Sequence, residues 1–431
     1  MLGAFANAFR TPDLRRKLLF VLLIIVIFRL GSQVPAPGVD VETVQRCFDN
    51  ADKDGIYGLI NLFSGGALLQ LTIFALGIMP YITASIILQL LVVVIPRLET
   101  LKKEGQAGQA KITQYTRYLT LGLAVLQGTG IVAMARVRQL IPGCNEQLLY
   151  HENARTMALM VVTMTAGTAI IMWLGELITD RGIGNGMSIL IFAQVVATFP
   201  AQLWQLKIAK GWAVFAGTVV IGLVIMLAVI FIEQAQRRIP VQYARRMVGR
   251  KMFGGSSTYI PLKVNQAGII PVIFASSLMY LPAMAIQFNQ NSDNPVLVWV
   301  SKYLVSGDHW YYMALYFAMV IFFTYFYVSI TFDTVEVADN MKKYGGFIPG
   351  IRAGKPTEEY LSYVLSRLTF PGSLYLGLIS LIPLFALKLV GASQNFPFGG
   401  TSLLIMVGVA LDTVKQIEGQ LQQRNYEGFL K

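Results

Sequence analysis

The sequence predicts an all-α polytopic membrane protein with ten transmembrane helices in two pseudo-symmetric five-helix halves and one short re-entrant helix. Three observations predict this fold class. Hydrophobic residues make up 55% of the 431 residues and charged residues only 13%, whereas soluble domains contain roughly 25% charged residues. The apolar residues gather in runs of about 20, the length of a membrane-spanning helix. Between Asp54 and Arg97, 42 residues carry no charge and divide into a short and a long apolar stretch.

Ten apolar runs are long enough to cross the hydrocarbon layer, which is about 30 Å thick, as helices that rise ~1.5 Å per residue. They lie at residues 18–34, 72–95, 116–135, 156–175, 186–206, 211–232, 265–288, 310–332, 368–388 and 396–411. Arg29 shortens the first run, and its long side chain is expected to reach the membrane surface. The segment LKIAKG separates five spans from five, so we expect an N-terminal half at residues 1–206 and a C-terminal half at residues 207–431.

The short stretch YGLINLFSGGALL, at residues 57–69, cannot cross the bilayer. A helix of this length reaches only about 20 Å, and Asn61, Ser64 and the Gly65–Gly66 pair make it polar and easily broken. A half-length helix between spans is tolerated only where protein or a water-filled cavity shields its ends. The stretch therefore predicts a re-entrant helix inside such a cavity, and with it a pore or transport protein.

Charge sets the predicted orientation. An even number of spans places both termini on one side of the membrane, and that side carries 25 of the 35 Lys and Arg residues. By the positive-inside rule, both termini are expected in the cytoplasm. Two long basic cytoplasmic loops, at residues 233–264 and 333–367, are either a docking face for acidic partners or solvated linkers that serve topology alone.

The residue types that carry most enzymatic chemistry are sparse. The two histidines, His151 and His309, lie in different predicted outer loops, so the chain has no HExxH motif, metal cluster or His-based triad. We therefore expect no catalytic residue, no metal, no cofactor and no enzymatic activity. Glu176, just past the end of the fourth span, is the only charge near a span core, whereas ion-coupled transporters need such charges as a relay.

Two further short features are the pair of cysteines and a glycine-containing string. Cys47 and Cys144 both fall on the predicted outer side, where a disulfide and two unpaired thiols both remain open. The string GIGNG at residues 182–186 lacks the third spaced glycine and the preceding strand of a nucleotide loop. It is interpreted as the flexible start of the fifth span.

Long motifs run along nearly the whole chain: NLFSGGALLQLTIFALGIMPYITASIILQLL, KITQYTRY, MWLGELITDRGIGNGMSILIF, RRIPVQYARR, YIPLKVNQAGIIPVIFASS, YGGFIPGIRAGKPT, SRLTFPG and FGGTSLLIMVGVALDT. In these motifs the sequence resembles the SecY family, the channel subunits of the bacterial protein translocase. The resemblance implies a ten-span clamshell that passes unfolded polypeptides across the cytoplasmic membrane and opens sideways to release membrane segments into lipid. A secondary transporter of small solutes and a structural scaffold for other membrane proteins are the alternatives from other classes.

The resemblance also implies residues for a plug and for a constriction ring. The plug closes the outer funnel and includes Gly58, Asn61, Phe63, Ser64, Gly65 and Gly66. The ring falls on Ile78, Ile82, Met187, Ile191, Ile273 and Ile405. Apolar side chains suit such a ring, because they fit around a moving chain without directional bonds and exclude ions when closed. Met187 departs from the isoleucine usual at its position, but its thioether is flexible and still apolar.

A lateral gate is implied between spans two and three on one side and spans seven and eight on the other. Its polar positions are Thr83, Gln89 and Ser276. Hydrogen bonds between membrane helices contribute only about 0.6–2 kcal/mol, which suits a seam that parts repeatedly. Ordinary interhelical contacts without a gating role are the alternative for these three residues.

The remaining implication concerns the cytoplasmic face and its partners. Its docking residues are Arg245, Arg246, Arg250, Lys251 and Arg352. Arginine suits this role, because its planar fork pairs with RNA phosphate or with protein carboxylates. The chain has no ATP site of its own, so the energy must come from partners. The partners implied are SecE-like and SecG-like small membrane subunits, the motor ATPase SecA, the ribosome, unfolded precursor polypeptides with signal sequences, and membrane lipids.

Overall fold

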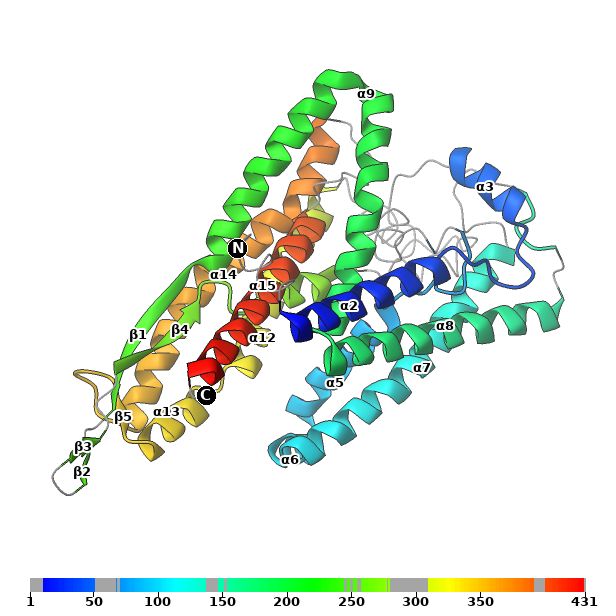
Figure 1. Ribbon diagram of the computed structural model, residues 1–431. Helices are drawn as coiled ribbons and strands as arrows, with labels where there is room; N and C mark the ends of the chain where they lie inside the picture. The colour runs from blue at the N-terminus through cyan, green and yellow to red at the C-terminus, as the bar shows by residue number, and fades with distance from the viewer. Residues whose placement is uncertain are drawn as a thin grey trace.

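The computed structural model is a helical bundle with a small β-sheet at one end (Figure 1). It describes residues 11–50, 67, 70–136, 146–150, 153–243, 246–248, 251–253, 257–276, 278–279, 309–390 and 400–429. The six predicted plug residues lie outside this part of the chain, as do Arg245 and Arg250.

The first half of the described chain is helical apart from its connections. Its helices are α2 (Pro12–Gly31), α3 (Val41–Asn50), α5 (Met79–Val94), α6 (Pro96–Lys103), α7 (Gln106–Arg136), α8 (Ala154–Arg181) and α9 (Gly186–Gln234). A proline stands in the first turn of α2, α5 and α6. There its missing N–H costs no hydrogen bond, and its fixed φ already suits a helix. Proline therefore starts three of these helices.

The second predicted span, at residues 72–95, is shorter than the sequence indicates. Residues 70–78 form turns instead of helix, with positive φ at Leu71 (47°) and Gly77 (56°), so α5 begins only at Met79. At its other end, Ile95 is extended, because the proline that follows disfavours helical geometry. There α5 and α6 meet at an angle of 100°. Hydrophobicity located this span, but glycine and proline set its ends.

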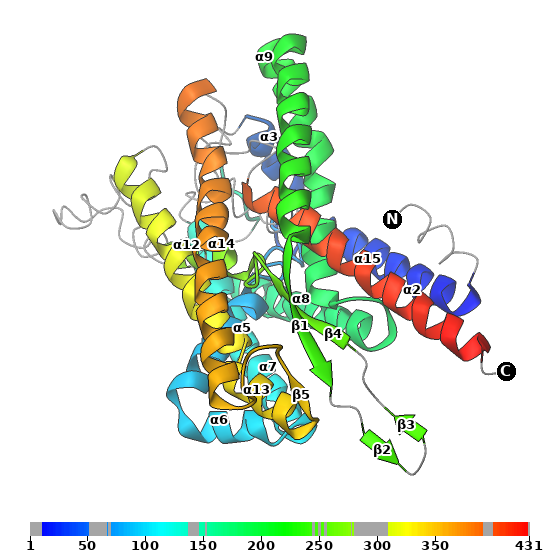
Figure 2. The same ribbon diagram turned by 90° about the vertical axis from the view of Figure 1, so that its left-hand side faces the viewer.

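Helix α9 contains the fifth and sixth predicted spans in one element. Gly211 interrupts it with φ 82° and ψ 178°, a conformation that is essentially restricted to glycine. In Figures 1 and 2, α9 rises to this break and then descends toward the sheet. The two spans are thus joined by a single non-helical residue.

The second half of the described chain contains α12 (Trp310–Thr331), α13 (Thr334–Lys343), α14 (Lys355–Val390) and α15 (Gly400–Phe429). A further helix, within the predicted seventh span, is described over residues 270–276. Five helical segments of the described chain are long and apolar enough to cross a membrane, and the bent pair of α5 and α6 makes six. Four predicted spans, the first, fifth, seventh and tenth, are not among these six. Helix α2 carries several charged residues, the apolar helix Gly186–Pro200 is shorter than a full span, and part of the seventh span lies outside the described residues.

The two long loops predicted as extended connections carry a small sheet. Strand β1 (Gln236–Tyr243) pairs antiparallel with β4 (Ser257–Lys263) and with β5 (Gly346–Phe347). A second hairpin joins β2 (Arg246–Val248) to β3 (Lys251–Phe253). The sheet has its own apolar core, which contains Ile239, Val241, Leu262, Met341, Ile348, Leu361 and Val364. The loops therefore form a packed unit, which alternation along RRIPVQY and STYIPLK could have indicated.

The beginning of α2 and the end of α15 lie together. The Lys17 ammonium donates a hydrogen bond of 3.3 Å to Gln420, and Leu14 is buried against Ile417 and Ile183. This pairing agrees with the predicted even number of spans, since both described ends of the chain lie at the same end of the bundle.

Candidate functional site

Five of the six predicted ring residues meet in one buried apolar cluster. Ile78, Ile191 and Ile405 are buried there, and Ile82 and Met187 pack against them. They come from the start of α5, from α9 and from α15, which belong to both predicted halves. The cluster also contains α2 and α8 side chains, including Phe28 stacked on Phe74. Residues far apart in the sequence thus converge on one apolar cluster.

Glycines fix the position of Met187 at the start of α9. A Cβ on Gly186 would overlap the carbonyl oxygen of Gly175 on α8, and the Met187 thioether lies against Gly175 itself. Asn185 caps the helix by accepting hydrogen bonds from the Met187 and Ser188 amides at 3.1 and 3.4 Å. The segment interpreted as a flexible start of the fifth span is instead a closely packed, capped turn.

Ile273, the sixth ring residue, is also buried, at 6% exposure. It lies on the helix at 270–276 and is not a member of the cluster of the other five. Ile269, one turn earlier, packs against both that cluster and the large apolar cluster of the second half. Ile273 thus belongs to a helix that contacts the cluster of the other five through Ile269.

The predicted gate residues use their polar groups in different ways. The Ser276 hydroxyl donates to the Val272 carbonyl oxygen at 2.8 Å and lies 3.0 Å from the Tyr316 hydroxyl on α12, so it joins spans seven and eight. Thr83 donates to Met79 within α5 at 3.0 Å, and Gln89 is exposed. The Ser276 bond therefore joins the two helices on one side of the predicted seam, whereas the Thr83 bond lies within a single helix.

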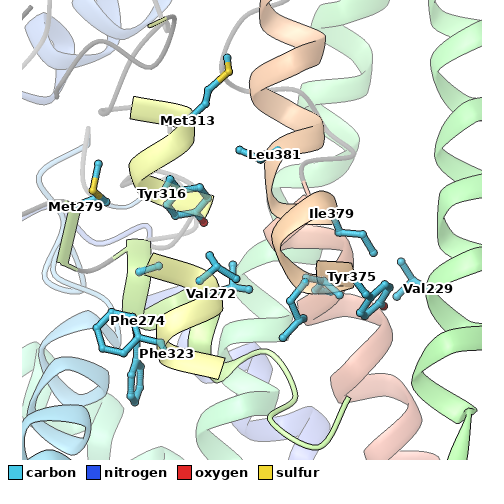
Figure 3. Close-up of a cluster of buried hydrophobic side chains, with 14 of the residues drawn as sticks. Val229, Val272, Phe274, Met279, Met313, Tyr316, Phe323, Tyr375, Ile379 and Leu381 are labelled. Atoms are coloured by element: carbon cyan, nitrogen blue, oxygen red, sulfur yellow. The ribbon is translucent and has the colours of Figure 1, made fainter. Parts of the chain in front are cut away.

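Contact across that seam is apolar. Ile86 of α5 packs against a cluster of the second half that contains Val272, Phe274, Tyr316 and Phe323. Figure 3 shows this cluster, to which the helix at 270–276, α12 and α14 all contribute side chains. The sequence analysis missed Ile86, although its spacing of four residues from Ile82 places it on the same helix face.

Arg117 and Glu176 form an ion pair with two hydrogen bonds between α7 and α8. The Arg117 Nε and Nη2 atoms donate to the two Glu176 carboxylate oxygens at 2.8 and 2.7 Å, and Nη1 donates to Gln114 at 3.0 Å. This planar, bidentate geometry is the strong form of an ion pair. Glu176, the one charge expected near a span core, is thus matched by a residue at the edge of the third span.

The segment that follows α2 is joined to two other parts of the chain. The Ala36 amide donates to Leu71 at 2.9 Å, and the Ile73 amide donates to Val34 at 2.9 Å. The Asp40 amide donates to Leu148 at 3.0 Å. Residues 34–50, 70–73 and 146–150 thus form one layer, which we call the rim.

Helix α3 lies in the rim; Asp40 directly precedes it and Cys47 lies within it. Asp40 accepts hydrogen bonds from the Thr43 hydroxyl (2.8 Å) and from the Glu42 and Thr43 amides. The Thr43 hydroxyl is the main reason why the pKa of Asp40 lies below its usual value. Cys47 is disulfide-bonded, whereas Cys144, the other cysteine of the sequence, lies outside the described residues.

The predicted docking residues lie at the sheet end of the bundle where the structure describes them. Arg246 and Lys251 belong to β2 and β3. Arg352 is exposed in the turn after β5, and its carbonyl oxygen accepts a hydrogen bond of 2.9 Å from the buried Thr357 hydroxyl. Gly350, with φ 84°, permits this turn. Because β5 pairs with β1, the turn that contains Arg352 follows the edge strand of the three-stranded sheet.

Two exposed arginines on β1 add to this basic surface. Arg237 and Arg238 are both exposed, and Arg238 lies 4.9 Å from the ring centre of Tyr259. They belong to the motif RRIPVQYARR but were not predicted to be docking residues. Their exposure on a strand became visible only with the sheet.

Comparisons with known proteins agree with this arrangement. The sequence profile of the SecY family matches residues 72–414. The chain is 66% identical over 438 residues to the protein translocase subunit SecY of Streptomyces griseus, and 57% identical over 441 residues to that of Mycobacterium tuberculosis strain H37Rv. Both alignments cover 100% of each chain.

Solved structures show the same fold. One described as a protein conducting channel superposes with a TM-score of 0.62 at 18% identity, and Sec61 in the canine ribosome-channel complex with a TM-score of 0.60 at 17% identity. Each superposition covers 92% of this chain and 90% of the other.

The fold and the relatives together assign the protein to the class of helical, multi-pass membrane channels. The family match and the full-length relatives identify the chain as a member of the SecY family. It is therefore a protein-conducting channel subunit of the bacterial Sec translocase, which works with other Sec components, and it is not an enzyme.

Proposed function

We propose that unfolded polypeptide passes between the two halves through a constriction formed by Ile78, Ile82, Met187, Ile191, Ile273 and Ile405. The convergence of five of these side chains on one buried cluster is the observation that carries the proposal. Branched and thioether side chains can retreat from a passing chain without breaking hydrogen bonds, and they exclude water and ions when they close again.

The two halves meet at Gly211, and the seam opposite opens toward lipid. The break in α9 supports this boundary, which lies a few residues after the one expected at 206/207. The apolar contact of Ile86 supports a gate that parts easily, because few directional bonds need to break. Ser276 and Tyr316 keep spans seven and eight together as that side moves.

Both termini and the sheet lie in the cytoplasm in this proposal, and the rim lies outside. The excess of Lys and Arg at the sheet end supports it, as does the disulfide-bonded Cys47 in the rim, because disulfides persist in oxidising compartments. A membrane-impermeant maleimide applied to intact cells should label Tyr150→Cys and not Arg352→Cys. Labelling at Arg352→Cys alone would reverse the orientation.

The basic sheet end is the docking face for SecA and the ribosome. Arg237, Arg238 and Arg352 are exposed there, and guanidinium groups pair with carboxylates and phosphates alike. SecE-like and SecG-like subunits complete the complex. Apart from Ala67, the plug at residues 57–69 lies outside the described residues, and its assignment rests on the short apolar stretch and the family resemblance.

A jamming experiment tests the proposed function against that of a solute transporter. A precursor that ends in a tightly folded domain should stall in the reconstituted complex and block the passage of a second precursor. A transporter would instead show saturable solute uptake driven by an ion gradient, and it would be indifferent to the stalled precursor. Continued passage of the second precursor would refute the channel proposal.

A further inference from the structure

Two tryptophans and a lysine form a cluster at the break in α9. The Lys207 ammonium lies 3.9 Å from the ring centre of Trp204 and 4.1 Å from that of Trp212. Trp204 and Lys207 precede Gly211, and Trp212 follows it directly. The cluster therefore connects the helical segments on the two sides of the break, at the end of the bundle away from the sheet (Figures 1 and 2).

Both indole rings are open to the surroundings. Trp204 is 59% exposed and Trp212 is 68% exposed, although large aromatic side chains are usually buried. Ile208, on the turn between them, is exposed as well. Lys207 is half-buried, because the rings cover it on two sides. The result is a surface of aromatic rings around one fixed positive charge.

An exposed apolar stripe lies further along α9, beyond this cluster. It consists of Val220, Ile221, Leu223, Val224, Leu227 and Phe231. From Trp212 to Phe231 the helix rises about 28 Å, at ~1.5 Å per residue, which matches the hydrocarbon thickness of a bilayer. Tryptophan gathers where hydrocarbon meets the headgroups. Trp212 thus marks the level at which the stripe leaves the hydrocarbon.

We propose that Trp204, Lys207 and Trp212 form a lipid anchor, in which the rings lie at the glycerol level and the lysine binds a phospholipid phosphate. Lys207 is only half-buried, and the N–H groups of its ammonium can donate to the phosphate oxygens. The rings supply apolar surface to the upper acyl chains, while each indole N–H reaches the polar layer. The anchor goes beyond the channel function, since it fixes the joint between the halves to the membrane surface.

Tryptophan fluorescence in the intact translocase complex tests the anchor. The chain has five tryptophans, so Trp173, Trp299 and Trp310 are replaced by Phe, and the complex is placed in nanodiscs of brominated phosphatidylglycerol. Bromine near the ester groups should quench the remaining fluorescence at least about twofold more than bromine near the chain ends. Equal quenching, or none, would overturn the anchor. No quenching would indicate that another subunit covers the surface.

Lys207→Gln tests the phosphate contact. In nanodiscs, this variant should raise the quenching constant for acrylamide by about twofold, because the rings lose the lipid that shields them. Lys210→Gln removes the same charge three residues further along the sequence and should leave the constant unchanged. In maltoside micelles, which contain no phosphate, the Lys207→Gln effect should vanish. An effect of equal size in micelles would show that the lysine only holds the rings and would refute phosphate binding.

Discussion

Glu176 illustrates how a single residue decides whether a charge is tolerated near the core of a membrane bundle. Its carboxylate receives two hydrogen bonds from Arg117 on the neighbouring helix, so neither charge is left unpaired. Sequence analysis identified Glu176 but not its partner, because 59 residues separate it from Arg117 and only the packing of α7 on α8 brings them together. Removing one partner of such a bidentate, partly buried ion pair costs more stability than removing one partner of a surface ion pair.

Replacing Glu176 by Gln should destabilise the chain by about 1–2 kcal/mol, because Arg117 loses its charged acceptor while both groups remain partly solvated. The midpoint of thermal unfolding in detergent measures the loss. Glu99→Gln is the matched control, since the Glu99–Lys103 pair lies on one exposed helix at 2.6 Å. The control should change stability by less than about 0.5 kcal/mol. Equal midpoints for the two variants would show that the Arg117 pair is not stabilising.

At the scale of elements, helix ends account for most differences between the predicted and observed fold. Ten apolar runs could be located from hydrophobicity, but the second span starts at Met79 instead of residue 72, and two spans merge into α9. Such ends depend on φ values at Leu71, Gly77 and Gly211, which hydrophobicity does not report. The sheet was missed because its strands were counted as part of charged loops.

Gly211→Ala should destabilise the chain by about 1–3 kcal/mol, because a residue with a Cβ is strained at φ 82° and ψ 178°. No atom lies within 4 Å of the added Cβ, so steric overlap does not contribute. Gly217→Ala, in the same helix and equally unobstructed, should be neutral or stabilising by up to about 1 kcal/mol. Thermal unfolding in detergent separates the two variants. A neutral Gly211→Ala would mean that the break in α9 is not a fixed conformation.

Helix α3 should lose protection at acid pH. The pKa of Asp40 is lowered in the folded chain, chiefly by its hydrogen bond from the Thr43 hydroxyl. Its stabilisation is therefore present above the unfolded pKa of about 3.9 and is lost as the pH falls through the folded value. Hydrogen exchange of the Glu42, Thr43 and Val44 amides should show lower protection factors at about pH 3 than at pH 7.

Asp40→Asn provides the control for this pH dependence. Asparagine caps helices about as well as aspartate but does not titrate. Protection of the same three amides should then be similar at both pH values. Persistence of the full pH dependence in Asp40→Asn would assign it to another group.

At the scale of the whole molecule, the apolar cluster of the proposed constriction joins elements that are remote in the sequence. Ile78 directly precedes α5, and Ile191 and Ile405 lie in α9 and α15. Nothing in local sequence distinguishes them from other isoleucines on membrane helices. The family resemblance singled them out, and their convergence became visible only in the folded chain. Ile86 and the paired strands show the converse, since these features followed from spacing and alternation but were overlooked. The plug residues remain predictions, because they lie outside the described part of the chain.

Disulfide crosslinking to a stalled precursor tests the path through this constriction most directly. A precursor with one cysteine, stalled midway in the complex, should form adducts with Ile82→Cys and Ile191→Cys. Val224→Cys lies on the exposed stripe of α9 and serves as the control, and the unsubstituted chain gives the background from its native cysteines. The account predicts strong adducts at both ring positions and background levels at Val224→Cys. Adducts at Val224→Cys with none at the ring would contradict it.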